Sequence, residues 1–394
     1  MISAVIIAGG RGARLKTLTS NLPKPLVDVN GKPFLFYLIR QLEEAGIKKI
    51  LILSGYLGEE FNKFVDQFKD QFSGIEISVR YSSPNLNTGE RLLDSFDELD
   101  NRFLFLYGDN YAPINLKKYI NKNLNESDSV SMLAYENSDG YSKSNILLDD
   151  YGKVLSYGSK SDHKYNPKHV DIGYFIMSKK HLQEIKKDHN EHFGRDILKP
   201  LIEKQKVIAT ILLSRYYTVG TIERLQSIRY FFRNTKHILI DRDGVLNVKP
   251  PRGTYVENKS QFVWRKGSLE GLKILKENGY KVIVISNQAG IGRGIFSTDA
   301  LELIHNKMCS DARENSGEIE YIYYCPHHWE DKCDCRKPKP GMLISAQKDL
   351  LFDLSKTFFI GDDERDGMAA EAASCKFIKV NEGDRLDDVV KKII

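Results

Sequence analysis

The sequence has no hydrophobic run long enough to cross a membrane, because every apolar run ends well short of the roughly 18 residues that a membrane helix needs. Its first apolar run, residues 4–8, passes straight into Gly9-Gly10-Arg11-Gly12, with no charged leader before it and no cleavage site after it. These absences argue against a membrane protein and against a secreted one. We therefore expect a soluble cytoplasmic protein.

Charge of one sign is not in excess either. The 394 residues include 58 Lys and Arg against 53 Asp and Glu, and the net charge of +5 is spread along the chain. So mild an excess indicates no nucleic-acid-binding patch, although it suits small anionic substrates. With 41% hydrophobic residues, 20 Tyr and 19 Phe, the composition is that of a globular protein and excludes a disordered one. The length predicts two or three domains.

Cysteine is scarce and odd in number, which argues against a disulfide framework. The five cysteines are Cys309, Cys325, Cys333, Cys335 and Cys375. Three of them lie within eleven positions, a spacing typical of a metal site in a reducing compartment. Cys309 and Cys375 lie on periodic apolar stretches, so we expect both in the core.

The sequence does contain a regular alternation of short β-branched runs and helical patterns, which predicts α/β domains with parallel sheets covered by helices. In the first half we expect strands at 3–8, 48–54, 75–81, 103–107 and 129–135, and an amphipathic helix at 34–45. In the second half we expect strands at 237–241, 280–286, 319–324, 357–361 and 376–380, and helices near 268–277, 299–314, 342–351 and 366–373.

The rhythm of strands and helices restarts at His237, so we place a domain boundary near Thr235. The predicted domains are residues 1–234 and 235–394. No Pro- or Gly-rich linker separates them, because residues 224–233 have a helical pattern. We therefore expect a stiff connection. No internal repeat is present.

Two carboxylates follow the first strand of the second domain. Asp241 and Asp243 are two residues apart at a strand end, so both project to the side where open α/β sheets bind ligands. Their repulsion calls for a shared proton or a divalent cation, and Asp362 adds a third carboxylate after a later strand. Such oxygen donors suit Mg²⁺. One carboxylate can then attack phosphorus while the other protonates the leaving oxygen. Taken alone, the Asp-x-Asp pattern is also compatible with a solvated turn.

In these motifs the chain resembles the haloacid dehalogenase-like phosphatases, over essentially all of residues 237–394. The resemblance implies a Rossmannoid fold in which Asp241 is the nucleophile and Asp243 the general acid/base, with Asp241, Asp243 and Asp362 around Mg²⁺. It implies that Lys337 holds the phosphoryl group and that Ser286 is the hydroxyl residue of the third strand-end motif. The pairs Ser286-Asn287 and Arg336-Lys337 supply donors for phosphate oxygens.

Residues 325–335 combine a Cys-x-His hook with a Cys-x-Cys hook. Cys325, Cys333 and Cys335 with one imidazole make a closed tetrahedral set, which favours a structural Zn²⁺ over a catalytic one. Free reduced cysteines are the alternative. The family pattern favours His327 over His328 as the fourth ligand. Zinc would stiffen the loop and the adjoining Arg336-Lys337.

This loop narrows the resemblance to the D-glycero-D-manno-heptose 1,7-bisphosphate 7-phosphatases and the related histidinol-phosphate phosphatases. The segments 287–294 and 336–342 resemble the heptose branch, and we expect Gln288 and Arg293 to contact the substrate. Arg293 adds a cation beyond the reacting phosphate, which suits a bisphosphate better than a cationic amino alcohol. Asp363 departs from the pattern, because the heptose enzymes have a lysine there.

The first half carries a second phosphate-type motif. A glycine loop at residues 9–12 lets backbone N–H groups approach a polyphosphate, and Pro23-Lys24-Pro25 holds a lysine in an extended segment. With Tyr107-Gly108-Asp109, these motifs resemble those of the sugar-phosphate nucleotidylyltransferases over residues 1–230. In that family a sugar 1-phosphate attacks the α-phosphorus of a nucleoside triphosphate in line. The resemblance implies a Rossmann-like fold, a phosphate cradle at Gly9, Gly10 and Gly12, charge neutralisation by Arg14 and Lys24, Mg²⁺ at Asp109, and a sugar-phosphate contact at Lys160. Asp171 stands where the family has Asn, and we expect it to hydrogen-bond sugar hydroxyls.

Three positions depart from that pattern. Thr218 stands where the family has the Asp that is its second Mg²⁺ ligand, and a hydroxyl is a poor substitute for a carboxylate on a hard cation. Ser159 replaces a Glu, and Glu90-Arg91 replaces a glycine pair near the base. The fold prediction is unaffected by these changes, whereas the activity of the domain is left open.

The two resemblances together suggest a bifunctional enzyme of nucleotide-heptose synthesis for surface polysaccharide such as lipopolysaccharide or capsule. The phosphatase would yield heptose 1-phosphate, and the first domain would activate it with a nucleotide, with guanine implied by the resemblance alone. We expect no nucleic acid or membrane partner. One alternative is an active phosphatase with an impaired first domain that only binds ligand or assembles oligomers. Another is a histidinol-phosphate phosphatase fusion.

Overall fold

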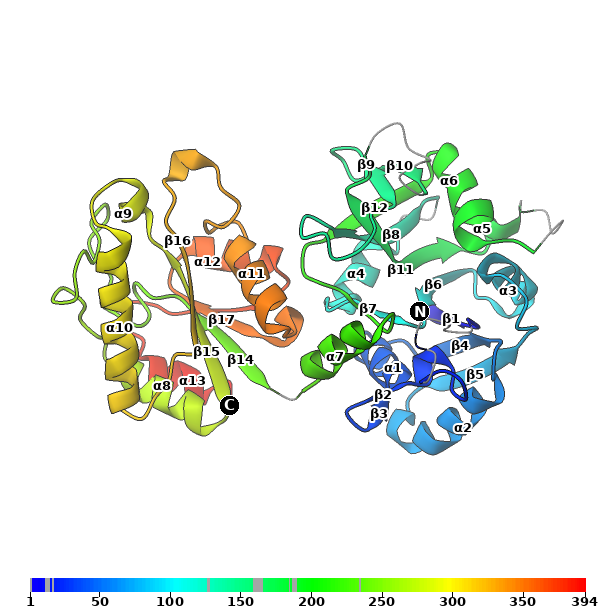
Figure 1. The fold of residues 1–394 in the computed structure, drawn as a ribbon, viewed down its shortest axis with the longest axis horizontal. Coiled ribbons are helices and arrows are strands. Elements are labelled where there is room, and N and C mark those ends of the chain that lie inside the picture. The colour runs from blue at the N-terminus through cyan, green and yellow to red at the C-terminus, as the bar shows by residue number, and fades with distance from the viewer. Residues whose placement is uncertain are drawn as a thin grey trace. The chain divides into compact units, whose positions relative to one another are not determined.

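The structure is a computed structural model that describes residues 2–10, 15, 18–125, 128–158, 166–183, 185, 190–233 and 235–394. The chain divides into two compact units, Met1–Phe232 and Arg233–Ile394 (Figure 1). Among the described residues, no helix combines the length and the apolar character that crossing a membrane requires.

A nine-stranded sheet forms the centre of the first unit within the described residues. Its main path runs β10 (Val154–Tyr157), β9 (Ile146–Leu148), β11 (His169–Ser178), β6 (Arg102–Tyr107), β1 (Ser3–Ala8), β4 (Lys49–Ser54) and β5 (Glu76–Tyr81). β8 (Val130–Glu136) pairs with β11, and β12 (Val207–Leu212) pairs with β8. Two small sheets join β2 (Asp28–Val29) to β3 (Lys32–Pro33) and β7 (Asn110–Tyr111) to β13 (Tyr217–Thr218).

The helices of this unit are α1 (Phe34–Glu44), α2 (Glu59–Phe68), α3 (Thr88–Asp94), α4 (Leu116–Asn123), α5 (Lys180–Gln183), α6 (Lys199–Glu203) and α7 (Ile222–Phe231). Shorter turns are the 3-10 segments η2 (Lys24–Leu26), η3 (Lys69–Phe72) and η4 (Phe96–Glu98), and the π-helical η6 (Phe193–Leu198).

β1 shows that this sheet is buried on both faces. Ala4 and Ile6 belong to one apolar cluster with side chains of α1, whereas Val5 and Ile7 belong to a second cluster with side chains of α3 and η6. Alternate residues of a strand point to opposite faces, so helices must cover both sides. The predicted strands of this half are confirmed as β1, β4, β5, β6 and β8.

The sequence pattern predicted a parallel sheet, but this sheet is mixed. β1 pairs in parallel with β4 and β6, but β11 runs antiparallel to β6 and to β8. A run of buried apolar residues has the same appearance in either direction, so the pattern of residues alone does not distinguish the two.

The second unit has a five-stranded sheet, and all of its pairs are parallel. The order is β16 (Tyr321–Cys325), β15 (Tyr280–Asn287), β14 (Lys236–Ile240), β17 (Phe358–Gly361) and β18 (Lys376–Lys379). Its helices are α8 (Ser268–Glu277), α9 (Ala289–Gly292), α10 (Thr298–Glu314), α11 (Gly341–Leu350), α12 (Glu364–Ala372) and α13 (Leu386–Lys391), with 3-10 turns η7 (Trp329–Asp331) and η8 (Leu354–Lys356).

The core of this unit packs α8, α10 and α13 against β14 and β15, and Figure 1 shows α11 and α12 on the other side of the strands. The predicted strands and helices of this half are confirmed within a few residues. The parallel sheet brings the carboxyl ends of β14, β15 and β17 to one edge, where the backbone N–H of Asp241 donates to the carbonyl of Ile360 at 2.9 Å. The candidate phosphatase residues follow those three strand ends.

Candidate active sites

Three buried or half-buried carboxylates meet at the edge of the second sheet. Asp241 follows β14, Asp362 follows β17 and Asp366 lies in the first turn of α12, and each offers an oxygen within 4.8 Å of the others. Lys337 is 3% exposed and bridges two of them, with its Nζ 2.8 Å from Asp241 Oδ1 and 2.7 Å from Asp366 Oδ1. The same Nζ donates to the carbonyl of Ile285 at 2.9 Å. Lys337 is therefore fixed inside the acidic cluster.

Asp366 is the member of this cluster that sequence reasoning missed. It lies four residues after Asp362, so one turn of α12 returns its carboxylate to the strand end. Asp363 begins that helix, and the Asp363 and Asp366 side chains cap it reciprocally. The i, i+4 spacing of the two outer carboxylates was the available signal.

Burial and charge act in opposite directions on the central pair. Burial raises the pKa of Asp241, the neighbouring charge of Asp366 raises it further, and Lys337 only partly offsets both. For Lys337, burial lowers the pKa, but Asp241 and Asp366 outweigh burial and raise it above its usual value. Lys337 thus stays protonated while the carboxylates around it repel one another.

Asp362 has one oxygen without a partner. Its Oδ2 lies 2.7 Å from Lys249 Nζ, whereas its Oδ1 is buried and accepts no hydrogen bond within the described residues. A side chain at Gly244, whose φ is +95°, would collide with this carboxylate, so only glycine permits the close approach. A buried carboxylate oxygen without a donor, beside two further carboxylates, fits the hard oxygen donors that Mg²⁺ prefers.

The carboxylate of Asp243 points to a different set of partners. Arg242, 1% exposed, donates to both of its oxygens at 2.9 to 3.2 Å, and Asn247 and Gln288 each donate at 3.0 Å. Burial alone would raise the pKa of Asp243, but Arg242 and these hydrogen bonds hold it below its ordinary value. Asp243 is thus an anion in this arrangement and lies outside the cluster of three carboxylates. Its predicted metal contact remains a prediction.

The residues after β15 connect Asp243 to the rest of the edge. Gln288 is fully buried and donates to Asp243 and, at 2.7 Å, to Ser286 Oγ, while its own oxygen accepts from Arg242 at 3.1 Å. Gln288 thus ties two other site residues together, and its contact with substrate remains a prediction. Asn287 pairs with the backbone of Lys337 in both directions, at 3.0 and 3.1 Å.

Two predicted arginines differ in their surroundings. Arg336 is half-buried, and its Nη1 is buried without a hydrogen-bond partner within the described residues, which leaves a donor available beside Lys337. Arg293 is exposed, with Nη1 3.4 Å from the hydroxyl of Tyr255 and its guanidinium 5.3 Å from the ring centre of Trp329.

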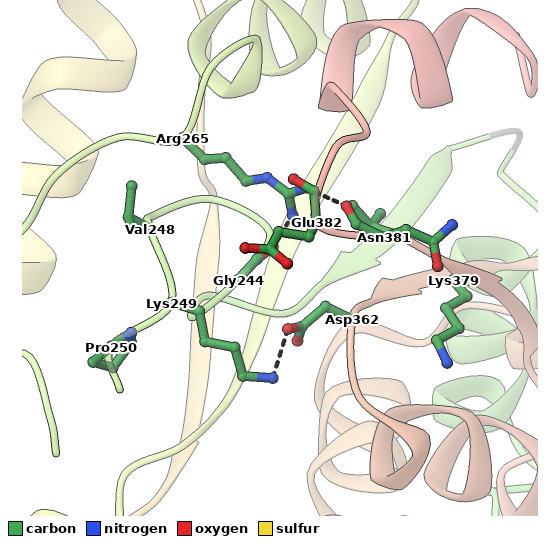
Figure 2. Close-up of a pocket in the computed structure, with 10 residues that line it drawn as sticks. Gly244, Val248, Lys249, Pro250, Arg265, Asp362, Lys379, Asn381 and Glu382 are labelled. Atoms are coloured by element: carbon green, nitrogen blue, oxygen red, sulfur yellow. Dashed lines mark hydrogen bonds and ion pairs between the residues drawn. The ribbon is translucent and has the colours of Figure 1, made fainter. Parts of the chain in front are cut away.

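A cavity of about 600 Å³ opens beside Asp362 (Figure 2). Its lining includes Gly244, Lys249 and Lys379, and its rim is held by Arg265, which donates to the carbonyls of Gly244, Asn381, Glu382 and Asp384. The nucleophile loop therefore borders a space that a ligand can enter.

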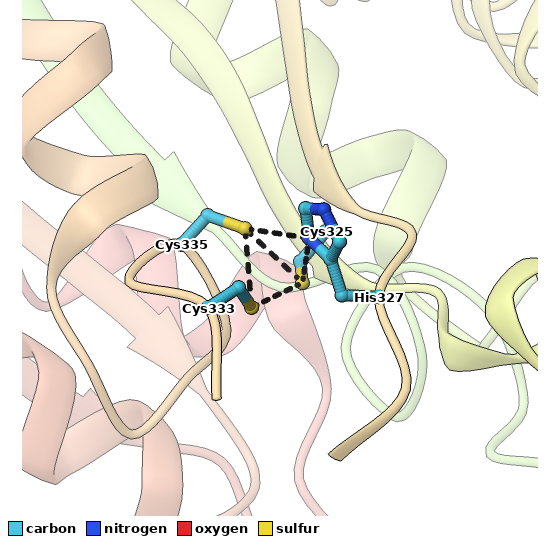
Figure 3. A group of neighbouring side chains, drawn as sticks. All are labelled: Cys325, His327, Cys333 and Cys335. Carbon is cyan, nitrogen blue, oxygen red and sulfur yellow. Dashed lines mark hydrogen bonds between the residues drawn. The ribbon is translucent and has the colours of Figure 1, made fainter. Parts of the chain in front are cut away.

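The four zinc-loop residues come together as predicted (Figure 3). The three sulfur atoms of Cys325, Cys333 and Cys335 are 3.3 to 3.6 Å apart, and His327 Nδ1 lies 3.2 Å from Cys335 Sγ and 3.6 Å from Cys325 Sγ. A tetrahedron with metal–sulfur bonds of about 2.3 Å has edges of about 3.8 Å, so one Zn²⁺ fits. His328 caps η7 and stacks on Trp329, outside this quartet.

In the first unit a cavity of about 500 Å³ collects most of the described candidate residues. Its lining includes Gly9, Gly10, Lys24 and Asp109, and Lys24 Nζ is ion-paired with Asp109. The predicted residues Gly12, Arg14 and Lys160, like Ser159, lie outside the described residues. No group of three metal-ligating side chains includes Asp109 within the part of the chain that the structure describes.

Asp171 lies behind two tyrosines that line this cavity. The hydroxyls of Tyr107 and Tyr157 donate to its Oδ2 at 3.3 and 3.1 Å, and the N–H of Gly173 donates to its Oδ1 at 2.7 Å. Thr218 is buried in β13 opposite Asn110, and the next residue donates to the carbonyl of Asp109. Thr218 therefore lies in the strand that pairs beside Asp109, and its place at a metal position remains a prediction.

Comparison with known proteins assigns both units. Residues 3–235 match the nucleotidyl transferase family, and residues 236–377 match the polynucleotide kinase 3 phosphatase family. The second unit is also 42% identical over 147 residues to D-glycero-beta-D-manno-heptose-1,7-bisphosphate 7-phosphatase of Pasteurella multocida, a match that covers 36% of this chain and 78% of that protein. The chain thus joins a member of the nucleotidyl transferase family to a member of the heptose-bisphosphate phosphatase family.

Two solved structures match the first unit. HddC from Yersinia pseudotuberculosis, complexed with GMP-PN, is 26% identical, with 59% of this chain and all of that one covered and a TM-score of 0.48. A protein from Bacillus anthracis described as a glucose-1-phosphate thymidylyltransferase, in complex with a sucrose, is 19% identical, with 59% of this chain and 96% of that one covered and a TM-score of 0.52. The second of these shares the fold of the first unit.

Proposed function

We propose that the chain carries two consecutive activities. Residues 235–394 would remove the 7-phosphate of D-glycero-D-manno-heptose 1,7-bisphosphate, and residues 1–234 would transfer a nucleotidyl group to the heptose 1-phosphate that results. The observation that carries the proposal is the buried cluster in which Lys337 bridges Asp241 and Asp366 beside the free oxygen of Asp362. The relationship to heptose-bisphosphate phosphatases supports the substrate.

In the phosphatase reaction Asp241 is the nucleophile. Its attack forms an aspartyl-phosphate bond and breaks the bond from phosphorus to the sugar oxygen, while Lys337 and the free Nη1 of Arg336 donate to phosphoryl oxygens. Asp241 and Asp362 would hold Mg²⁺, whose charge would stabilise the phosphoryl group. Exposed Arg293 would meet the distal phosphate.

Asp243 is the proposed general acid and base. Because Arg242 and Gln288 hold it as an anion, it must leave these partners and bind a proton before it can protonate the departing sugar oxygen. The same carboxylate then takes a proton from the water that hydrolyses the aspartyl-phosphate. The Zn²⁺ proposed for the cysteine quartet has a structural role, since four protein ligands leave no open position.

In the first unit the phosphate oxygen of a sugar 1-phosphate attacks the α-phosphorus of a nucleoside triphosphate, and pyrophosphate leaves. Lys24 lines the cavity and would offset charge on the departing pyrophosphate, and Asp109 would hold Mg²⁺. Lys24 must then exchange its ion pair with Asp109 for the phosphates. We propose GTP as the donor and the cytoplasm, where nucleoside triphosphates are made, as the location.

A second candidate function follows from Thr218. Because this hydroxyl replaces a carboxylate next to Asp109, the first unit would bind nucleotide sugar ligands without catalysis, and the phosphatase would be the only activity.

One assay separates these proposals. The purified chain is incubated with heptose bisphosphate or heptose 1-phosphate, Mg²⁺ and each nucleoside triphosphate in turn, and phosphate and pyrophosphate are followed. We expect phosphate from the bisphosphate without any nucleotide, and pyrophosphate from heptose 1-phosphate with one preferred nucleotide. Phosphate without pyrophosphate supports the ligand-binding alternative, and faster hydrolysis of histidinol phosphate contradicts the heptose assignment.

Each unit supplies the control for the other. Asp241→Asn abolishes phosphate release and leaves pyrophosphate release from heptose 1-phosphate unchanged, because Asp241 belongs to the second unit and the proposed transferase residues belong to the first. Lys24→Met has the reverse effect. Loss of both activities in either variant contradicts the assignment of one activity to each unit.

A further inference from the structure

An arginine is buried in the wall of the first unit's cavity. Arg91, on α3, is 2% exposed and is one of the residues that line the cavity. Its guanidinium donates to the carbonyl of Ser54 at 2.6 Å, to Ser82 Oγ, to the carbonyl of Ser83 at 3.1 Å and to the carbonyl of Leu86 at 3.0 Å. These bonds tie residues 82–86 to the end of β4.

The guanidinium occupies space that two glycines leave open. A Cβ at Gly9 would lie 2.5 Å from Arg91 Nε, and a Cβ at Gly55 would lie 2.5 Å from Arg91 Nη1. Both distances are far inside van der Waals contact. Gly9 lines the cavity, whereas Gly55 does not, so the arginine lies between the cavity wall and the residue behind it.

Charge balance does not explain the arginine. No carboxylate forms an ion pair with Arg91 within the described residues, and the four acceptors that it meets are neutral oxygens. Burial of such a cation has a cost in free energy that the hydrogen bonds offset. A planar fork with five donors reaches four acceptors at once, which an ammonium group with three donors does not. Arg91 therefore acts by holding backbone.

The backbone that it holds forms one wall of the cavity. Pro84 and Leu86 give this wall an apolar surface, and the backbone of Gly9 and Gly10 lines the same cavity. The charged pair Lys24 and Asp109 occupies another part of the lining. A nucleotide has a flat apolar base and a charged phosphate tail, so the apolar walls suit the base and the ion pair suits the phosphates.

The far end of the same wall is also fixed. The backbone N–H of Asn87 donates to Asn190 Oδ1 at 2.5 Å, and the Asn87 side chain donates to the carbonyl of Asn190 at 2.8 Å. Asn190 also donates to the carbonyl of Asn85 at 2.8 Å, and the N–H of Ser82 donates to the carbonyl of Ser54 at 3.2 Å. Arg91 adds the bonds that hold the carbonyls of Ser83 and Leu86, so it contributes to the distance from this segment to the Gly9–Gly10 backbone.

We propose that Arg91 is a positioning residue that determines which nucleotide base the first unit accepts. By holding the 82–86 segment to the end of β4, it sets the width of the slot between Gly9–Gly10 and Pro84–Leu86. The inference rests on the proposed nucleotide site of this unit. It does not require that the unit catalyse nucleotidyl transfer.

The test measures dissociation constants of GTP, ATP, CTP and UTP by calorimetry on the full-length chain. We expect one nucleotide to bind most tightly to the unmodified protein. Arg91→Lys keeps the positive charge but loses the planar group with five donors. We expect it to weaken binding of the preferred nucleotide about 10-fold and to narrow the range of the four dissociation constants. General misfolding would instead weaken the binding of all four nucleotides alike and leave the ratios of their dissociation constants unchanged.

Two further variants keep the proposal open to contradiction. Arg80→Lys makes the same change on β5, where the arginine pairs with Glu98 outside the cavity lining, and leaves all four constants unchanged. Gly55→Ala displaces the guanidinium from behind, so in a chain that keeps Arg91 it causes the same loss of selectivity. In a chain that already carries Arg91→Lys, it changes the dissociation constants by less than about 2-fold.

The outcomes are distinguishable. The inference is overturned if Arg91→Lys leaves the ratios of the four dissociation constants unchanged. It is also overturned if Gly55→Ala has the same effect in the Arg91→Lys chain as in the chain that keeps Arg91. Selective binding that depends on Arg91 without pyrophosphate release supports the inference and contradicts only the transferase proposal. Absence of binding by all four nucleotides overturns both.

Discussion

Asp171 is a buried carboxyl with no cation beside it among the residues that the structure describes. It is 8% exposed, and its hydrogen bonds come from two tyrosine hydroxyls and one backbone N–H. Burial raises its pKa from 3.8 to about 6, because these bonds only partly replace water. The folded state therefore binds a proton more tightly than the unfolded state does, and stability falls as pH rises from about 4 through 6.

Asp171→Asn removes this penalty. We expect the variant to gain stability at pH 8, by at most about 3 kcal/mol, and to equal the parent at pH 4, where both side chains are neutral. Chemical unfolding of the first unit at the two pH values measures the difference. Asp66→Asn on exposed α2 is the matched control and shows no such pH dependence. A gain that is equal at both pH values contradicts the explanation.

Much of the candidate phosphatase site could be predicted from motif spacing, but the direction of its side chains could not. Asp241 and Asp362 each follow a strand, so the strand pattern in the sequence and the order of strands in the sheet are enough to predict that the two carboxylates lie close together. Asp243 differs, because the partners that orient it include Gln288, which reaches it from the segment after β15, as well as Asn247 of its own loop. Gln288 illustrates the same limit, since a motif position shows neither burial nor hydrogen-bond partners.

The zinc loop is the element on which the position of Lys337 depends. The last two residues of the quartet are followed at once by Arg336 and Lys337, and α11 begins so close to them that a side chain at Gly341 would collide with the carbonyl of Asp334. On the other side Asn287 holds the backbone of Lys337. A change in the loop is therefore transmitted to the phosphatase centre.

Cys333→Ser tests this connection. We expect the metal content to fall from about one zinc per chain to near zero, because a ligand is lost, and phosphate release to fall by at least about 10-fold, because the loop that leads into Lys337 loses its metal. Metal analysis and the phosphate assay provide the measurements. Cys309 is half-buried and lies outside the quartet, so Cys309→Ser is the control and keeps both the zinc content and the rate of phosphate release. Full activity without zinc contradicts the coupling.

Secondary structure was predictable where the periodicity was strong. The stripe of Leu35, Leu38 and Leu42 predicted α1, and all three are fully buried. Its end was also predictable, since Gly46 follows with a φ of +87°. The π-helical η6 had no such signal, because its hydrogen-bond pattern depends on packing against α3 and α6 and not on a repeat of residue types.

At the scale of the whole molecule, each unit has its own apolar core. The two clusters of the first unit and the cluster of the second share no residue, and the only link of the chain between them follows Phe232. We therefore expect two thermal transitions in the full-length chain.

Ligands identify the two transitions. A zinc chelator lowers the melting temperature of the transition that belongs to the second unit, and a saturating nucleoside triphosphate raises that of the other, since each ligand acts on the unit that binds it. Differential scanning calorimetry of the intact chain with each addition measures both shifts. One transition that responds to both additions contradicts independent folding.

The cluster around Lys337 has a consequence for how a cation binds. Burial and the neighbouring charge of Asp366 raise the pKa of Asp241, so without a cation this carboxyl favours its protonated form. A divalent cation held by Asp241 and Asp362 would displace that proton and leave the carboxylate available as the nucleophile. Cation binding is therefore expected to release a proton into the buffer at pH 6, and less than one at pH 9.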